Sequence, residues 1–166
     1  MHLQVILGSI REGRRSGPVA QWAYGQAQAQ IAKHSDLTVE LIDLKAWKLP
    51  LFDLEQFPSE GNDQNPLQQR WAATIARADG YLFVSPEYNH GYTAALKNAL
   101  DSLYAEWNRK PASFVAFGNA EGARDMTAKI RDGVFHADPR EDQRFGVMFD
   151  EWLWWANALR AACAGA

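Results

Sequence analysis

The sequence predicts an α/β protein in which helices cover both faces of a parallel sheet. Short apolar runs without polar alternation recur along the chain, as is typical of strands covered on both faces. Segments in which apolar residues recur at helical spacing separate these runs. Because crossovers between parallel strands are right-handed, we expect a three-layer sandwich with a parallel sheet in the strand order 2-1-3-4-5.

Length and composition limit the class of protein further. A chain of 166 residues can bury a core without disulfides or metals, and we expect residues 1–166 to form a single domain. The only cysteine, Cys163, allows no intrachain disulfide and favours a reducing compartment, so we expect a cytoplasmic protein. A net charge of -3 argues against nucleic-acid binding. Since no run of about 18 apolar residues occurs, we expect no membrane span.

The first third of the chain predicts a strand, a helix and a second strand, followed by a long loop. The first strand covers Leu3–Leu7, and Pro18 lies in the first turn of the helix that follows. The second strand covers Leu37–Leu44. The segment Lys45–Asp63 is irregular, and a loop of this length in a compact domain is commonly functional. We therefore expect it to be a lid or an interface segment.

The loop after the first strand has the composition of an anion site. Residues 8–17 (GSIREGRRSG) combine hydroxyls, guanidinium groups and glycines immediately before a helix, whose free N–H groups attract anions. The loop has neither the dinucleotide fingerprint GxGxxG nor the Walker pattern, so a monophosphate fits it better. A solvated basic loop with a capping serine is the alternative.

The third apolar run, Gly80–Val84, leads into the most informative loop. Pro86 stops this strand because proline cannot donate to a ladder, so the loop begins at the strand's carboxyl end. Ligands bind at that end in open α/β sheets. We expect Asn65-Pro66 to open the helix before the strand and Thr93 to cap the helix after the loop. The helix that Thr93 caps should carry an apolar stripe on one face, formed by Leu96, Leu100, Leu103 and Trp107.

The end of the chain predicts a fourth strand and a less regular remainder. The fourth strand covers Ala112–Phe117, and a glycine-rich loop over residues 118–122 follows it. We expect a short helix over Arg124–Arg131 and a fifth strand over Phe145–Phe149 in a shortened or irregular region. Asp150 is expected to cap the last helix. One face of that helix should carry Trp152, Trp155, Ala156 and Leu159, and another face Trp154.

Two blocks, Pro86-Glu87-Tyr88-Asn89 and residues 96–101 (LKNALD), resemble the NAD(P)H-dependent FMN reductases and the related quinone, azo-dye and chromate reductases of flavodoxin-like fold. The resemblance includes residues 8–11, 49–53 and 118–119, and it covers about residues 1–124. It implies one flavodoxin-like domain with FMN as cofactor and NAD(P)H as co-substrate. It also implies a small-molecule electron acceptor, such as a flavin, a quinone, an azo dye or a metal oxyanion.

The resemblance also implies which residues bind the cofactor. In family members the residues that match Ser9, Arg11 and Ser16 hold the flavin phosphate, and we expect Tyr88 to lie against the flavin ring. Hydride transfer to a flavin needs no protein acid or base, so we expect no catalytic side chain, and for Glu87 a role in loop geometry or a subunit contact. The full set of expected cofactor contacts is Ser9, Arg11, Arg15, Ser16, Pro86, Glu87, Tyr88, Asn89, Gly118 and Asn119.

Several alternatives stay open. A flavodoxin-type one-electron carrier would bind the same FMN, but we would expect a much more acidic surface. A flavodoxin-like binding module without catalysis is a second alternative, because the chain is shortened towards its end. The four scattered histidines and one cysteine give no metal-ligand spacing, so we expect no metal. The resemblance suggests a homodimer or a tetramer. The large rings of Trp47, Phe52, Tyr104 and Trp107 suggest the same, since they exceed what one small core need bury.

Overall fold

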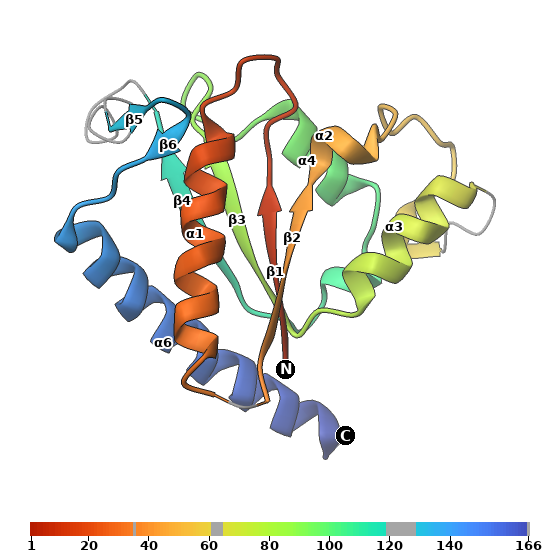
Figure 1. The fold of residues 1–166 in the computed structure, drawn as a ribbon. Helices are drawn as coiled ribbons and strands as arrows, with labels where there is room; N and C mark the ends of the chain where they lie inside the picture. Colours follow the sequence, from red (N-terminus) through yellow and green to blue (C-terminus); the bar gives the residue numbers. More distant parts are fainter. Residues whose placement is uncertain (35, 61–64, 119–128, 166) are drawn as a thin grey trace.

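A computed structural model describes residues 1–34, 36–60, 65–118 and 129–165 (Figure 1). At its centre lies a parallel sheet of four strands in the order β2-β1-β3-β4. The strands are β1 (His2–Leu7), β2 (Thr38–Asp43), β3 (Gly80–Pro86) and β4 (Ala112–Phe117). The predicted α/β class and the placement of the third strand beside the first are confirmed.

Five α-helices are described around this sheet. They are α1 (Ser16–Ile31), α2 (Leu44–Trp47), α3 (Pro66–Ala76), α4 (Ala94–Asp101) and α6 (Pro139–Ala164). Short 3-10 helices cover Pro58–Glu60 and Ala105–Trp107, and the strands β5 (Ile130–Arg131) and β6 (Val134–Phe135) form an antiparallel hairpin. No helix in the described ranges is both long and apolar enough to cross a membrane.

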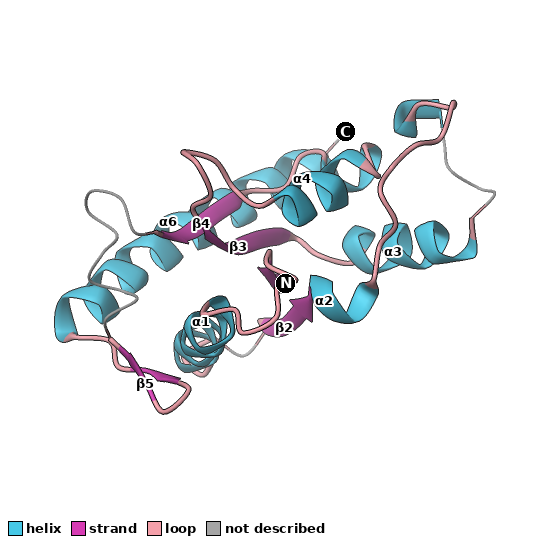
Figure 2. Ribbon diagram, turned by 90° about the horizontal axis from the view of Figure 1, so that it is seen from above, coloured by secondary structure: helices cyan, strands magenta, loops and turns pink. Residues whose placement is uncertain are grey.

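The helices lie in two layers, one on each face of the sheet. Viewed from above, α1 lies on one side of the sheet and α3 and α4 lie on the other (Figure 2). The core beneath α1 and α6 includes Val5, Val84 and Phe149. The core beneath α3 and α4 includes Trp71 and Phe83. The central strand β3 is thus covered on both faces, which is why it is apolar without alternation.

Local sequence signals set the starts of two helices as predicted. The Asn65 side chain accepts hydrogen bonds from the backbone N–H groups of Leu67 and Gln68, and Pro66 occupies the first turn of α3. Thr93 caps α4 by accepting from the N–H group of Leu96 at 3.1 Å. Both caps satisfy backbone donors that have no partner within the helix.

The predicted fifth strand is wrong, because Phe145–Phe149 lies inside α6. This helix begins earlier than predicted. Its N-cap is Asp138, which forms a reciprocal capping box with Glu141, whereas Asp150 is an interior helical residue. Within the described residues no strand pairs with the outer edge of β4. The residues that α6 buries recur at helical spacing: Phe145, Phe149, Trp152 and Ala156.

Other boundaries also differ from the predictions. Most of the helix predicted over Arg124–Arg131 lies outside the described residues, which resume at residue 129. The last two residues of that range belong to β5. The α4 helix ends at Asp101, so Leu103 and Trp107 follow it, although both still pack on the α4 side of the sheet. Leu44 begins α2 instead of ending β2. Trp155 is half exposed instead of facing the core.

Two of the rings expected at a subunit interface pack within the chain's own core. Trp47 and Trp107 both contact Trp71, with ring centroids 5.0 and 6.2 Å away. Trp107 also lies 4.9 Å from Tyr81 and donates its indole N–H to the carbonyl of Leu100. Both indoles are partly buried against this core, so by themselves they do not require a partner chain.

Candidate functional site

A crevice of about 290 Å³ opens at the carboxyl ends of β1, β3 and β4. The loop after β1 and the turn after β3 lie side by side at this end of the sheet (Figure 1). The volume is close to the lower end of the usual range for small-molecule sites, about 300 to 1,000 Å³. The lining residues are Ser9, Arg11, Arg14, Arg15, Ser16, Pro86, Glu87, Tyr88, Phe117 and Gly118.

The loop between β1 and α1 is held in place by an ion pair. Both terminal nitrogens of the Arg14 guanidinium donate to the carboxylate of Asp43 at the end of β2, and one of them also donates to the carbonyl of Ser9. Burial alone would raise the pKa of Asp43, but hydrogen bonds from Arg14 and from the N–H group of Lys45 hold that pKa below its usual value. The loop is thereby fixed to β2.

The N-terminus of α1 is open on the side of the crevice. Side chains cap each of the other described α-helices, whereas Arg15 at the N-cap of α1 makes no side-chain capping bond. The Ser16 side chain lines the crevice and is 1% exposed, and its hydroxyl has no hydrogen-bond partner among the described residues. A buried hydroxyl without a partner costs free energy, so its presence here points to a ligand that accepts or donates a hydrogen bond.

Two guanidinium groups at this helix terminus have no partner among the residues that the structure describes. Arg11 and Arg15 line the crevice and are exposed, and neither forms a hydrogen bond or an ion pair with a described residue. Arg14 differs, because Asp43 neutralises it. The first loop therefore presents two available cations, a buried hydroxyl and the N-terminus of a helix to the same space, a combination that suits an anion.

The turn after β3 is shaped by its backbone. Tyr88 and Gly91 exchange N–H to carbonyl bonds of 2.7 and 3.1 Å, and Asn89 and His90 between them have φ values of 52° and 65°. Positive φ at both central residues is the geometry of a type I′ turn, which asparagine tolerates better than most residues. Glu87 stabilises the turn, since its carboxylate accepts from the N–H group of His90 at 2.6 Å.

Close packing joins this turn to the end of β4. The N–H group of Glu87 donates to the carbonyl of Phe117 at 2.6 Å. A Cβ atom on Gly118 would come within 2.8 Å of the Glu87 Cβ atom, closer than real carbon contacts allow. Gly118 therefore permits an approach that no other residue would permit without moving the turn.

The two loops meet across the crevice. The Tyr88 hydroxyl lies 3.5 Å from the Ser9 hydroxyl, and the Thr93 hydroxyl donates to the carbonyl of Gly8. A Cβ atom on Gly8 would lie 3.2 Å from the Leu96 side chain. The arrangement places the arginine cations on one side of the crevice and a phenol ring with proline and the Glu87 carboxylate on the other.

The structure brings together most of the residues that the sequence singled out. Asn89 lies at the tip of its turn and does not line the crevice, and Asn119 lies outside the described residues. Sequence reasoning missed Arg14 and Phe117 as lining residues. Arg14 stands between two residues of the predicted anion loop, and Phe117 ends the predicted fourth strand, so position along the chain was the available signal. The eight expected residues that do line the crevice are Ser9, Arg11, Arg15, Ser16, Pro86, Glu87, Tyr88 and Gly118.

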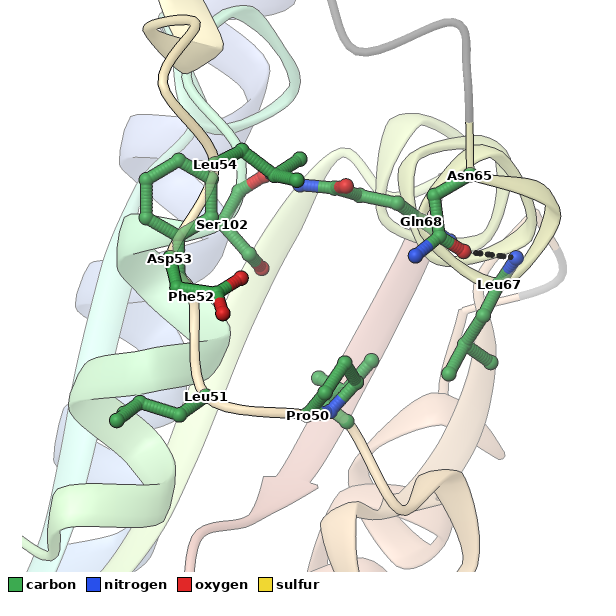
Figure 3. A pocket seen from close by; sticks show the side chains of 10 residues that line it. Pro50, Leu51, Phe52, Asp53, Leu54, Asn65, Leu67, Gln68 and Ser102 are labelled. Carbon is green, nitrogen blue, oxygen red and sulfur yellow. Dashed lines mark hydrogen bonds between the residues drawn. The ribbon is translucent and has the colours of Figure 1, made fainter.

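Two further hollows flank the long loop after α2. A cavity of about 40 Å³ separates the segment Pro50–Leu54 from Asn65, Leu67 and Gln68 (Figure 3). A groove of about 530 Å³ lies between α2 and α4, and its lining is mostly apolar, with Ile10 and Leu51 among its residues. Ile10 belongs to the loop after β1, so the groove adjoins the crevice.

Comparisons with known proteins agree with this geometry. A family model described as NADPH-dependent FMN reductase matches residues 1–141. An NAD(P)H-dependent FMN reductase of Schizosaccharomyces pombe is 37% identical over 129 residues, which cover 76% of this chain and 62% of that protein. A probable NADPH:quinone oxidoreductase of Oryza sativa is 30% identical, with coverages of 81% and 68%. The chain thus spans less than two thirds of the fungal relative's length.

A solved structure supports the fold over a larger share of the chain. The structure is that of a flavoenzyme NAD(P)H:(acceptor) oxidoreductase, FerB, from Paracoccus denitrificans, and it superposes with a TM-score of 0.67. The superposition covers 95% of this chain and 97% of that one at 17% sequence identity. At this identity the likeness bears on the fold alone, and it confirms the flavodoxin-like architecture.

Proposed function

The chain belongs to the NADPH-dependent FMN reductase family, and from this premise we propose that it binds FMN in the crevice and passes electrons from NAD(P)H to small-molecule acceptors. We further propose that the described elements act together as one flavin-binding domain, because the two hydrophobic cores lie on the two faces of one sheet. We propose the cytoplasm as its location, since the one cysteine, Cys163, is exposed and unpaired.

The observation that carries the proposal is the buried hydroxyl of Ser16 at the open end of α1, which has no hydrogen-bond partner in the part of the chain that the structure describes. FMN has a terminal phosphate, and the first loop offers that phosphate Ser9, Ser16, Arg11 and Arg15. The residues present therefore fit the cofactor. The flavin ring would then lie beside Pro86, Tyr88 and Gly118, where backbone and aromatic groups can bracket a planar molecule.

Each group of the crevice has a distinct task in this proposal. FMN, when bound, supplies the acceptance of hydride and the release of electrons. Arg11 and Arg15 neutralise the phosphate, and Arg14 keeps the loop in place through Asp43. Glu87 holds the turn that positions Tyr88, and it needs no part in proton transfer. Water is excluded from one side of the crevice by Phe117, which is buried at the end of β4.

We propose that NAD(P)H and the acceptor use the crevice in turn, which is a ping-pong order. The position of the crevice at the carboxyl ends of the strands supports this order, since both substrates must reach the same ring. Initial rates measured against both substrates should give parallel lines in double-reciprocal plots. A pattern of intersecting lines would show that both substrates bind together and would contradict the proposed order.

We propose a homodimer, or a tetramer built from such dimers, in which the loop after α2 and the adjoining groove meet a second copy. Asn98 of α4 ties this loop down, because its side chain accepts from the N–H group of Phe52 and donates to the carbonyl of Pro50. The loop nevertheless exposes Leu51 to 79% and Phe57 to 68%. Exposed apolar residues on a fixed loop are typical of interfaces.

The dimer is tested by replacing Leu51 instead of Trp107, because Trp107 belongs to the core. Leu51→Asp should lower the molecular mass found by light scattering and should also lower flavin retention. The matched control is Val147→Asp on α6, where the parent side chain is 61% exposed and distant from the loop. A parent protein that is a monomer of 18.7 kDa with full activity would contradict the proposed dimer.

Absorbance and turnover separate the proposed reductase from its alternatives. The purified protein should show flavin bands, and NAD(P)H oxidation with quinone, azo-dye, free-flavin and chromate acceptors should reveal which acceptor class it reduces. A protein that binds FMN but does not oxidise NAD(P)H would favour the one-electron carrier. A colourless protein that takes up no FMN would favour the binding module. The mild net charge of -3 speaks against the carrier.

A further inference from the structure

The two edges of the sheet are built differently. The edge strand β2 carries two acidic side chains, since Glu40 pairs with Arg77 and Asp43 pairs with Arg14. Charged side chains on an edge strand are one of the ways by which proteins prevent edge-to-edge pairing. The other edge strand, β4, has the sequence ASFVAF, which contains no charge, proline or glycine.

The hydrogen bonds of β3 show which backbone groups of β4 are unused. The N–H groups of Tyr81 and Glu87 donate to the carbonyls of Pro111 and Phe117, so the odd-numbered residues of β4 face β3. Backbone direction alternates along a strand, and Ala112, Phe114 and Ala116 therefore direct their N–H and C=O groups to the open side. Among the described residues, no strand pairs with these backbone groups.

The side chains of these same residues form an apolar surface beside the open edge. Ala112, Phe114 and Ala116 are all exposed, Phe114 to 57%, and the Phe114 ring stacks on Phe83 at 5.2 Å. The opposite face of β4 is covered, because Val115 and Phe117 pack into the core that α6 closes. Strand β4 is thus covered by α6 on one face and exposed to solvent on the other.

We propose that the β4 edge pairs with the β4 edge of a second copy of this chain, antiparallel about a two-fold axis at Phe114. The outward residues are symmetric about this position, since an alanine lies two residues before it and another two residues after it. A two-fold axis would set Phe114 opposite its own copy and Ala112 opposite Ala116. Each of these pairs exchanges two backbone hydrogen bonds.

The side chains of the strand suit this occupant. Paired phenylalanines on adjacent strands attract each other, and the flanking alanines leave room for both rings. The absence of charge along β4 means that no like charges oppose one another across the axis. A self-complementary surface related by two-fold symmetry is the usual form of contact between identical chains. The result is one continuous sheet through both copies, with the two crevices at opposite ends.

This pairing is independent of the dimer proposed through Leu51, and the experiment separates the two. With both contacts present the parent is a tetramer, so light scattering on the Leu51→Asp protein should still give twice 18.7 kDa. Adding Phe114→Lys should reduce this mass to a single chain, because two like charges would meet at the axis. Adding Val147→Lys instead replaces a side chain of similar exposure on α6 and should leave the mass unchanged.

Amide hydrogen exchange of the parent protein tests the pairing without relying on a variant. The amides of Ala112, Phe114 and Ala116 should be protected at high protein concentration and lose that protection on dilution. The amides of Ser113 and Val115, which bond to β3, should stay protected at both concentrations. Rapid exchange of the three outward amides at every concentration would overturn the proposal. So would protection that persists on dilution, or pairing only with another protein.

Discussion

The two loops that form the crevice differ in how they are held and in what they offer. The loop after β1 is rich in cations, and its geometry depends on an ion pair between Arg14 and Asp43. The turn after β3 contributes no cation, and backbone bonds, positive φ angles and the contact between Glu87 and Gly118 determine its shape. In the proposed flavin site, the loop after β1 would therefore select a ligand by charge, and the turn after β3 would select it by shape.

The largest expected effect on FMN binding comes from the arginines of the loop after β1. Arg11→Ala should weaken FMN binding by about 1.5 to 3 kcal/mol, because one charge-assisted hydrogen bond is lost, and adding Arg15→Ala should weaken it further. Titration of the apoprotein with FMN measures both steps. Arg160→Ala, which removes an exposed arginine of α6, is the control and should bind FMN as the parent does. Equal affinity for FMN in Arg11→Ala and the parent would contradict the phosphate assignment.

A smaller effect is expected on the side that selects by shape. Gly118→Val should cost about 1 to 3 kcal/mol of FMN binding or stability, since its Cβ atom would collide with Glu87 and push the turn. The loss should be insensitive to salt, unlike that of the arginine variants, because no charge is removed. Gly165→Val, at the end of α6, is the control, because a Cβ atom there has no contact nearer than 3.8 Å. A salt-dependent loss in Gly118→Val would show that the two sides are not separate.

The smallest expected effect concerns the ion pair that holds the charged loop. The pKa of Asp43 is lowered in the folded protein, so its ionised form adds stability that is present above the unfolded pKa of about 3.9 and is lost as the pH falls through the lower, folded pKa. Asp43→Asn should therefore destabilise by about 1 kcal/mol or less near neutral pH, because the pair is partly exposed to solvent. Urea unfolding at several pH values should show this difference disappearing in acid. A difference that grows in acid would contradict the sign of the shift.

Signals that lie within a few residues of one another predicted the fold well. Asn65-Pro66 and Thr93 mark helix starts because a cap needs only its own next turn, and the structure confirms both. The run Phe145–Phe149 misled, because five apolar residues fit a buried strand as well as a helix. Two features favour the helix instead. A capping box of Asp138 and Glu141 begins it, and Trp152 continues the helical spacing of buried residues.

The residues of the candidate site could be predicted from the sequence, but their hydrogen bonds and ion pairs could not. The sequence placed Ser16 and the arginines before a helix, yet the burial of the Ser16 hydroxyl depends on how α1 packs on the sheet. The pairing of Arg14 with Asp43 spans 29 residues and exists only because β1 and β2 are neighbours. The positive φ of Asn89 was likewise invisible, since asparagine tolerates that angle without requiring it.

The most direct test compares how the apoprotein binds FMN and riboflavin, which differ only in the phosphate. The loop after β1 predicts that the parent binds FMN much more tightly than riboflavin. It also predicts that Ser16→Ala and Arg11→Ala each reduce this preference while leaving riboflavin affinity unchanged. If the parent binds both compounds equally well, or if both variants keep the full preference for FMN, the crevice does not hold the phosphate at the N-terminus of α1.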